Sequence, residues 1–231
     1  MRPRPPLADA GGGVRALDLF CCAGGASDGL TRAGYDVEGI DCDAQLEYPY
    51  DFERADVLYL EPESLHGFDL VWASPPCQAF TAYKRRPGHV AEALNLIPET
   101  RALLRRAGVP YVIENVVGAP LENPVTLCGS MFGLDVKRHR IFECSFPVAA
   151  PPCRHNVWEG NRFPGATNRA ANSRKTVEIG VYRIPLPLQR LAMGVKRDVS
   201  LGKLSQMVPP AFAEWLGLQA RAHYMTNWRA A

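Results

Sequence analysis

The fold is decided by residues 68–78, which read FDLVWASPPCQ. The apolar first half is typical of a buried strand of a parallel sheet, and the two prolines mark the point where that strand stops. Open α/β sheets bind their ligands outside the carboxyl ends of the strands. Because consecutive prolines fix two φ angles and supply no N–H, we expect Cys77 to be held in an irregular, pre-set position. A small cysteine buried beside a proline-rich turn is the alternative interpretation.

On both sides of this stretch, apolar runs alternate with helical segments. The predicted strands are residues 14–20, 37–40, 56–58 and 110–113, and the predicted helices are residues 28–33, ending at Gly34, and 91–107, ending at Gly108. Such an alternation at short spacing predicts an α/β fold with a mostly parallel, doubly wound, Rossmann-like sheet.

Residues 21–27, CCAGGAS, form a turn of small residues between the first strand and the first helix. Glycine lets the backbone approach a ligand and the N–H groups of a helix N-terminus point at it, so this arrangement is typical of a nucleotide cradle. Asp41 follows about twenty residues later, where a carboxylate can accept hydrogen bonds from ribose hydroxyls. Two alternatives stay open: the glycines serve close packing, and Asp41 caps a following helix.

The composition indicates one domain with an insertion, because 231 residues with 47% hydrophobic residues suffice for one sizeable core. Residues 1–13 are rich in Pro, Gly and Ala, and we expect a flexible tail without a signal-peptide core. No apolar run approaches the length of a membrane span. We therefore expect a soluble, cytoplasmic protein without a membrane partner.

The chain contains seven cysteines, an odd number in a chain too long for a disulfide scaffold, which favours reduced thiols. A zinc site formed by Cys128, Cys144, Cys153 and His155 is an alternative, but these residues contain no Cys-x-x-Cys spacing. We therefore predict no metal site.

Five short motifs follow one another along the chain. They are DLFCCAGG (residues 18–25), PPCQ (75–78), ENV (114–116), RHR (138–140), and VPPA with LG (208–211 and 216–217). In this order and spacing they resemble the motifs of the DNA (cytosine-5) methyltransferase family, in a compact, phage-like form.

The resemblance implies methyl transfer from S-adenosyl-L-methionine to C5 of cytosine. Because C5 is a poor nucleophile, a thiolate must first add to C6 and so activate C5. By resemblance, Cys77 is this nucleophile, and Glu114 is the acid that serves N3. Asn115 would hold the exocyclic amine or the acid. Arg140 would contact the base near O2 and support the thiolate, and Arg138 would fix a loop or a phosphate.

The resemblance also implies a cofactor site around the glycine turn. Phe20 and Cys42 would lie at the adenine, Asp41 at the ribose and Asp56 near the adenine amine. The complete set of expected cofactor-binding residues is Asp18, Phe20, Cys22, Ala23, Gly24, Gly25, Asp41, Cys42, Asp56, Pro76 and Met207.

Three places depart from the family's pattern. Cys22 stands where the family usually has the first glycine of the turn, so a Cβ must be accommodated near the cofactor. Val136 replaces the usual Gln before the paired arginines. Residues 205–207, SQM, replace the usual Gly-Asn before the closing motif.

Attack on C6 comes from above the base, so the target cytosine must flip out of a duplex or lie in a single strand. Residues 80–89 form a candidate lid, and residues 151–197 carry nine Lys or Arg against two acids, a net charge of +7. A solvated surface insertion is the alternative for the second stretch. The expected nucleic-acid contacts are Gln78, Lys84, Arg85, Arg86, Arg154, Arg162, Arg174 and Lys175.

We therefore divide the chain into a tail (1–13), a catalytic and cofactor-binding core (14–145), a short target-recognition insertion (146–188) and a segment that completes the core (189–231). The short insertion predicts short or relaxed specificity for double-stranded DNA. We also expect a monomer. The expected setting is a bacterial or phage-infected cell, where modification protects DNA from restriction. Three other functions stay open: the same reaction on tRNA, transfer of an altered group from a modified S-adenosylmethionine, and a catalytically inactive DNA-binding module.

Overall fold

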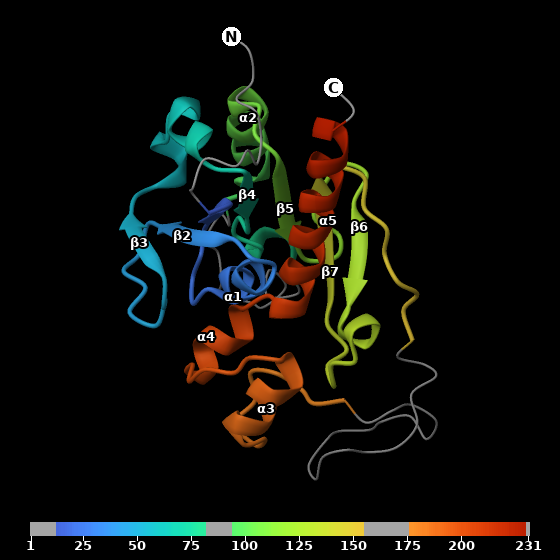
Figure 1. Ribbon diagram of the computed structural model, residues 1–231. Coiled ribbons are helices and arrows are strands. Elements are labelled where there is room, and N and C mark those ends of the chain that lie inside the picture. Colours follow the sequence, from blue (N-terminus) through green and yellow to red (C-terminus); the bar gives the residue numbers. More distant parts are fainter. Residues whose placement is uncertain (1–12, 82–93, 155–175, 230–231) are drawn as a thin grey trace.

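The computed structural model describes residues 13–81, 94–154 and 176–229. A seven-stranded sheet with the order β3-β2-β1-β4-β5-β7-β6 runs through its centre (Figure 1). The pairs from β3 to β5 are parallel, whereas β7 runs antiparallel to β5 and β6. The strands are β1 (Arg15–Leu19), β2 (Asp36–Asp41), β3 (Asp51–Arg54), β4 (Leu70–Ala73), β5 (Tyr111–Asn115), β6 (Val125–Cys128) and β7 (His139–Cys144).

Alternate residues of the central strands face two different helix layers. On one face, Leu17 and Val71 pack with side chains of α2. On the other face, Ala16 and Trp72 pack with side chains of α1 and α5. Since a strand buried on both faces is typical of a doubly wound sheet, the expected α/β fold is confirmed. The helices are α1 (Gly25–Arg32), α2 (Ile97–Ala107), α3 (Leu186–Met193), α4 (Leu201–Gln206) and α5 (Pro210–Arg229).

Helices α1 and α5 cross with their backbones in close contact. A Cβ on Gly29 of α1 would collide with the carbonyl oxygen of Pro210, so a larger residue would force the helices apart. Beside this crossing, the ring of Phe142 packs edge-on against Trp72 and Phe212, with centroids 5.7 and 6.0 Å away. This aromatic core fixes β4 and β7, which carry residues of the candidate site.

Two predicted elements differ from the structure. The strand predicted at residues 56–58 is wrong, because Asp56 caps a 3₁₀ turn there by accepting a hydrogen bond from the N–H of Leu58. The actual strand, β3, is a short edge strand with exposed polar residues and so carries no apolar pattern. The helix predicted from residue 91 begins at Ile97, and residues 94–96 are not helical; residues 91–93 lie outside the described residues.

The last helix, α5, runs from Pro210 for 20 residues. Residues 155–175 lie outside the described residues, so the boundaries of the recognition insertion stay a prediction. Among the described residues, no helix combines the length and the apolar character needed to cross a membrane.

Candidate active site

The carboxyl ends of β4 and β5 bring Cys77 and Glu114 to one edge of the sheet. Ala73, the last residue of β4, pairs with Ile113 of β5. Cys77 lies in the loop after β4, and Glu114 is the residue of β5 that follows Ile113. The N–H of Ser74 donates to the carbonyl oxygen of Leu19 at 3.1 Å, which anchors the loop with the two prolines to β1. Cys77 is half-buried and precedes a 3₁₀ turn, at φ −96° and ψ −2°. The expectation of an irregular position outside the ladder is confirmed.

Glu114 and Arg140 form a buried ion pair at this edge. Arg140 Nε lies 3.0 Å from Glu114 Oε1, and the carboxylate of Glu114 is 9% exposed. Burial raises the pKa of Glu114, while the charges of Arg140 and Arg138 act in the opposite direction. The net direction is upward, so Glu114 takes up a proton more readily than an exposed carboxylate does.

The pKa of the Cys77 thiol is also raised. Burial is the main cause and the carboxylate of Glu114 adds to it, whereas Arg140 and Arg138 lower the pKa. Arg140 therefore acts on Cys77 in the direction expected from the sequence, but burial and Glu114 outweigh it. The thiol and the carboxyl influence one another, so ionisation of one disfavours ionisation of the other.

Asn115 supports the loop with the two prolines. Its Nδ2 donates to the carbonyl oxygen of Pro75 at 3.0 Å, and its Oδ1 accepts from the N–H of Val116 at 2.9 Å. The side chain is fully buried. Both of these partners are backbone groups, so Asn115 positions the nucleophile loop. The expected contact with the substrate amine or the acid stays a prediction.

Arg138 joins β7 to the end of α4. Its Nη2 donates to the carbonyl oxygen of Ser205 at 2.6 Å, and burial lowers the pKa of the guanidinium to about 9. The side chain therefore stays charged at neutral pH. Of the two expected roles for Arg138, this contact agrees with fixing a loop.

The glycine turn has an unusual backbone. Phe20, Cys22 and Gly24 have φ angles of +60°, +48° and +76°, all in the left-handed region. A Cβ on Gly25 would lie 2.5 Å from the carbonyl oxygen of Val208, so the turn also packs tightly against the closing motif. The turn leaves the N-terminus of α1 without a side-chain cap, as a nucleotide cradle requires.

Two of the departures from the family pattern meet at this turn. The Sγ of Cys22 lies 3.4 Å from Oε1 of Gln206 in α4, so the extra Cβ points toward the replaced segment 205–207. The positive φ of Cys22 shows why a glycine suits this position.

Asp18 lies beneath the turn at the end of β1. Ser27 Oγ donates to Asp18 Oδ2 at 2.6 Å and lies 2.8 Å from the hydroxyl of Tyr48. Among the described residues, Asp18 Oδ1 has no hydrogen-bond partner, although it is buried. Burial raises the pKa of Asp18 to about 7. An unpaired buried acceptor beside a left-handed turn fits a polar cofactor that approaches the backbone.

Asp41 stands at the end of β2, where its two oxygens accept hydrogen bonds from the N–H groups of Cys22 and Asp43, both at 3.0 Å. The structure has β3 rather than a helix after this segment, so the helix-capping alternative is wrong. Each oxygen keeps a second lone pair, which leaves Asp41 able to accept from a ribose.

The other expected cofactor residues differ in burial. Met207 is buried and packs with Ala23. Cys42 and Asp56 are exposed, and Pro76 is half-buried.

Few of the expected nucleic-acid contacts lie in the described residues. Gln78 is exposed in the 3₁₀ turn after Cys77, and the exposed Arg154 donates its backbone N–H to Ser130 Oγ at 3.0 Å. The remaining six, Lys84, Arg85, Arg86, Arg162, Arg174 and Lys175, lie outside the described residues.

Some arginines of the basic stretch 151–197 form ion pairs within the chain. Arg183 pairs with Glu178, and Arg190 pairs with Asp198. Their charges are therefore partly neutralised, and the net charge of the stretch overstates what is free for phosphates.

Arg197 is a residue that sequence reasoning missed. Its Nε lies 3.1 Å from Asp28 Oδ1 of α1, Nη1 donates to the carbonyl oxygen of Glu47 at 3.0 Å, and Nη2 donates to that of Ala23. It thus holds the glycine turn from outside. From the sequence, Arg197 was only one of the nine basic residues in the stretch 151–197. No local pattern indicates its partner Asp28, which lies 169 positions away.

Comparison with known proteins gives a family match in the front half of the chain. The model of the C-5 cytosine-specific DNA methylase family matches residues 14–122. No curated protein matches the chain. The resemblance to the DNA (cytosine-5) methyltransferase family is thereby confirmed, and the methyl donor of that family is S-adenosylmethionine. The geometry of the glycine turn and Asp18 fits this cofactor.

Solved structures share the fold at low identity. A DNMT2 mutant from Spodoptera frugiperda has 14% identity and a TM-score of 0.57 over 88% of this chain and 98% of that chain. The Entamoeba histolytica methyltransferase EhMeth has 10% identity and a TM-score of 0.54 over 90% and 98%. A structure described as a DNA modification methyltransferase from an E. coli prophage has 22% identity and a TM-score of 0.43 over 56% of this chain. This chain spans only 45% of that prophage protein.

Proposed function

We propose that this chain, whose residues 14–122 match the C-5 cytosine-specific DNA methylase family, methylates C5 of cytosine in DNA through a covalent bond between Cys77 Sγ and C6. The observation that carries the proposal is the buried Glu114–Arg140 ion pair beside a cysteine held outside the sheet. Binding alone needs neither a nucleophile nor a buried acid next to it.

The first step is transfer of a proton from the Cys77 thiol to the Glu114 carboxylate, which the raised pKa of Glu114 favours and the raised pKa of Cys77 opposes. Moving the proton from the thiol to the carboxylate produces a thiolate and a carboxylic acid, the two forms that the reaction needs. The thiolate then forms the bond to C6, and the ring electrons move toward N3, where the Glu114 proton is delivered. Arg140, next to Glu114, stabilises negative charge on the ring.

S-adenosylmethionine, which the glycine turn, Asp18 and Asp41 would hold, would supply an electrophilic methyl group. C5 of the activated ring would bond to that methyl group as its bond to the sulfonium sulfur breaks, and S-adenosylhomocysteine would leave. A base then removes the C5 proton, the electron pair re-forms the ring double bond as the Cys77 sulfur leaves C6, and the N3 proton returns to Glu114. Asn115 and Arg138 serve this sequence indirectly, since one holds the Pro75 carbonyl and the other the Ser205 carbonyl.

We further propose that the substrate is a double-stranded DNA whose target base flips toward Cys77. The exposed Gln78 directly after the nucleophile supports this, as do the positive charges at Lys84, Arg85 and Arg86. Residues 146–188 would supply a short recognition segment, and the protein would act as a monomer.

The test is intact-mass analysis after incubation with S-adenosylmethionine and a duplex that contains 5-fluorocytosine. Because fluorine blocks loss of the C5 substituent, we expect a protein–DNA adduct carrying one methyl group. Cys77→Ser should abolish the adduct, whereas Cys144→Ser, a control at a cysteine of β7 with no proposed role, should keep it.

The other outcomes redirect the proposal. An adduct with a matched RNA and not with DNA would assign the reaction to RNA. An adduct heavier than methyl would indicate an altered donor. DNA retardation in a gel without any adduct would favour an inactive binding module.

A further inference from the structure

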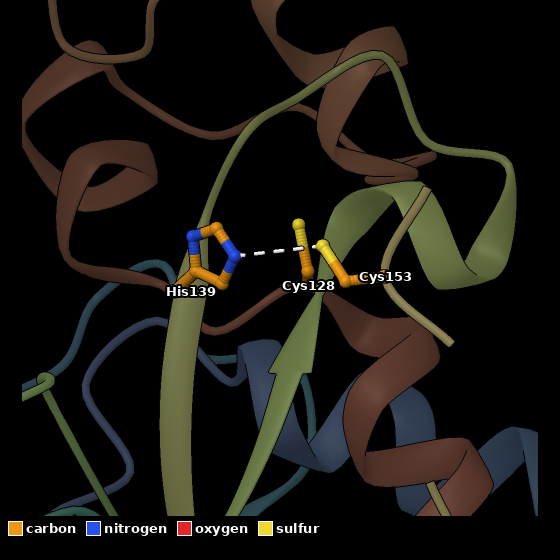
Figure 2. Close-up of side chains that lie close together, drawn as sticks. All are labelled: Cys128, His139 and Cys153. Atoms are coloured by element: carbon orange, nitrogen blue, oxygen red, sulfur yellow. Dashed lines mark hydrogen bonds between the residues drawn. The ribbon is translucent and has the colours of Figure 1, made fainter. Parts of the chain in front are cut away.

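We propose that Cys128, His139 and Cys153 bind one zinc ion on the side of β7 that faces away from the Glu114–Arg140 pair. Figure 2 shows the three side chains pointing toward one another. Their ligand atoms all lie within 4.8 Å of one another. The zinc alternative considered from the sequence contained Cys128 and Cys153 but not His139. The proposal is independent of the methyltransferase reaction.

Sheet register brings the first two ligands together. Cys128, the last residue of β6, is the direct cross-strand partner of His139, the first residue of β7. Directly opposed residues of an antiparallel pair project from the same face, about 5 Å apart at Cβ. The neighbouring Arg140 projects from the other face and meets Glu114. The position of the pair therefore follows from the backbone.

Cys153 completes the group from a separate segment. Its Sγ lies 3.6 Å from Nε2 of His139. Tetrahedral zinc with ordinary Zn–S and Zn–N bond lengths places a sulfur and a nitrogen ligand about 3.5 Å apart, and two sulfurs about 3.8 Å apart. The distance from Cys153 Sγ to His139 Nε2 matches the sulfur–nitrogen value. The two sulfurs lie within 4.8 Å of one another, so a small movement of the side chains brings them to the sulfur–sulfur value.

The surroundings of the sulfurs suit thiolate ligands. Ser130 Oγ lies 3.4 Å from Cys128 Sγ and 3.5 Å from Cys153 Sγ. Cys128 Sγ also accepts from the N–H of Met131. Ser130 Oγ donates its proton to Cys128 Sγ and accepts from the N–H of Arg154, which holds the hydroxyl in place beside both sulfurs. Such outer hydrogen bonds orient metal ligands and stabilise their charge.

The ligand types select the metal. Two thiolates and one imidazole are the donors that zinc prefers, whereas magnesium and calcium prefer oxygen. Binding releases the two thiol protons to solvent and leaves one tetrahedral position for water or another donor. The ion would connect the end of β6, the start of β7 and the segment around Cys153. It would thereby fix the strand that carries Arg140, without touching the reacting base.

The test measures metal in the full chain, produced with zinc in the medium and purified without a histidine tag. Elemental analysis should give about one zinc per chain. Replacement by Co²⁺ should produce visible bands together with thiolate-to-cobalt charge-transfer absorption. The variants are Cys153→Ser, at an exposed position that tolerates substitution, and His139→Gln. The matched control is Cys144→Ser, also on β7 but outside the group.

We expect both variants to lose zinc and the charge-transfer band, and the control to retain both. A chelator should lower the melting temperature of the parent chain and leave that of the Cys153→Ser chain unchanged. Retention of zinc in the variants would overturn the proposal, since the ion would then lie elsewhere. Zinc-free parent protein, with either free thiols or a Cys128–Cys153 disulfide by mass spectrometry, would overturn it equally.

Discussion

Around β1 and β2 the candidate site is shaped by backbone, whereas around β4, β5 and β7 it is shaped by charged side chains. The first region has three residues with positive φ in the turn after β1, and its glycines touch the backbone of the closing motif. The second region has ordinary backbone at Cys77 and a buried ion pair between Glu114 and Arg140. Both regions lie at the carboxyl edge of the same sheet.

This difference indicates which substitutions each region tolerates least. A cradle made of backbone is sensitive to any added Cβ, because packed backbone atoms cannot move aside cheaply. A site made of charges is sensitive to substitutions that preserve shape and remove charge. We therefore expect mutations in the first region to lower stability and those in the second to lower rate.

Glu114→Gln should have the largest effect, and this effect should be on the rate of methyl transfer and not on the stability of the fold. Losing the acid should slow methyl transfer by about 10²- to 10⁴-fold, the usual contribution of general acid catalysis. Without the carboxylate charge the pKa of Cys77 should fall, so iodoacetamide should alkylate Cys77 faster at a fixed pH. Peptide mass spectrometry separates Cys77 from the other cysteines.

The control is Glu122→Gln, which breaks the exposed ion pair with Arg105. It should change neither rate nor alkylation. Slower alkylation in Glu114→Gln would show that the carboxylate does not oppose the thiolate.

Asp18→Asn tests a charge buried within the backbone region. The pKa of Asp18 is about 7 in the folded chain against an ordinary 3.8, so unfolding releases a proton between these values. Stability is therefore fully present at low pH and is lost as the pH rises through 7. From pH 5 to pH 7 the parent should lose about 2 to 3 kcal/mol relative to Asp18→Asn, as measured by urea unfolding. A difference independent of pH would contradict a raised pKa.

Gly25→Ala should destabilise the fold by about 1 to 3 kcal/mol, because the new Cβ would lie 2.5 Å from the Val208 carbonyl oxygen. Its control is Gly202→Ala in α4, where nothing lies within 4 Å. Helix propensity should make that variant more stable by up to about 1 kcal/mol. Urea unfolding measures both, and equal stabilities would mean that the turn yields more easily than its packing indicates.

The smallest expected effect is the difference in stability between Cys22→Gly and Cys22→Ala. Both remove the contact with Gln206, but only glycine relieves the left-handed backbone at φ +48°. The glycine variant should be more stable than the alanine variant by about 1 kcal/mol. Thermal unfolding of the pair measures this difference, and an alanine variant of equal or greater stability would refute backbone strain at Cys22.

The sequence predicted the parts of the site that depend on local pattern. Apolar runs identified β1, β2, β4 and β5, and Cys77, Glu114 and Asp41 were predicted at strand ends because parallel strands end at one edge. The sequence did not predict β3, because this strand lies at the exposed edge of the sheet and has no apolar pattern. It also counted Arg197 only as one of nine basic residues in a stretch expected to contact nucleic acid.

What the sequence by itself determined is the α/β alternation, the resemblance to the methyltransferase family and the residues at the sheet edge. Only the tertiary structure decided which side chains meet. Asn115 bonds to a residue 40 positions away, Arg138 to one 67 away and Arg197 to one 169 away. The meeting of Cys128 with His139 likewise depends on the register of β6 and β7. Strand register and helix crossing set these contacts, and because both arise from packing of the whole chain, no local pattern encodes them.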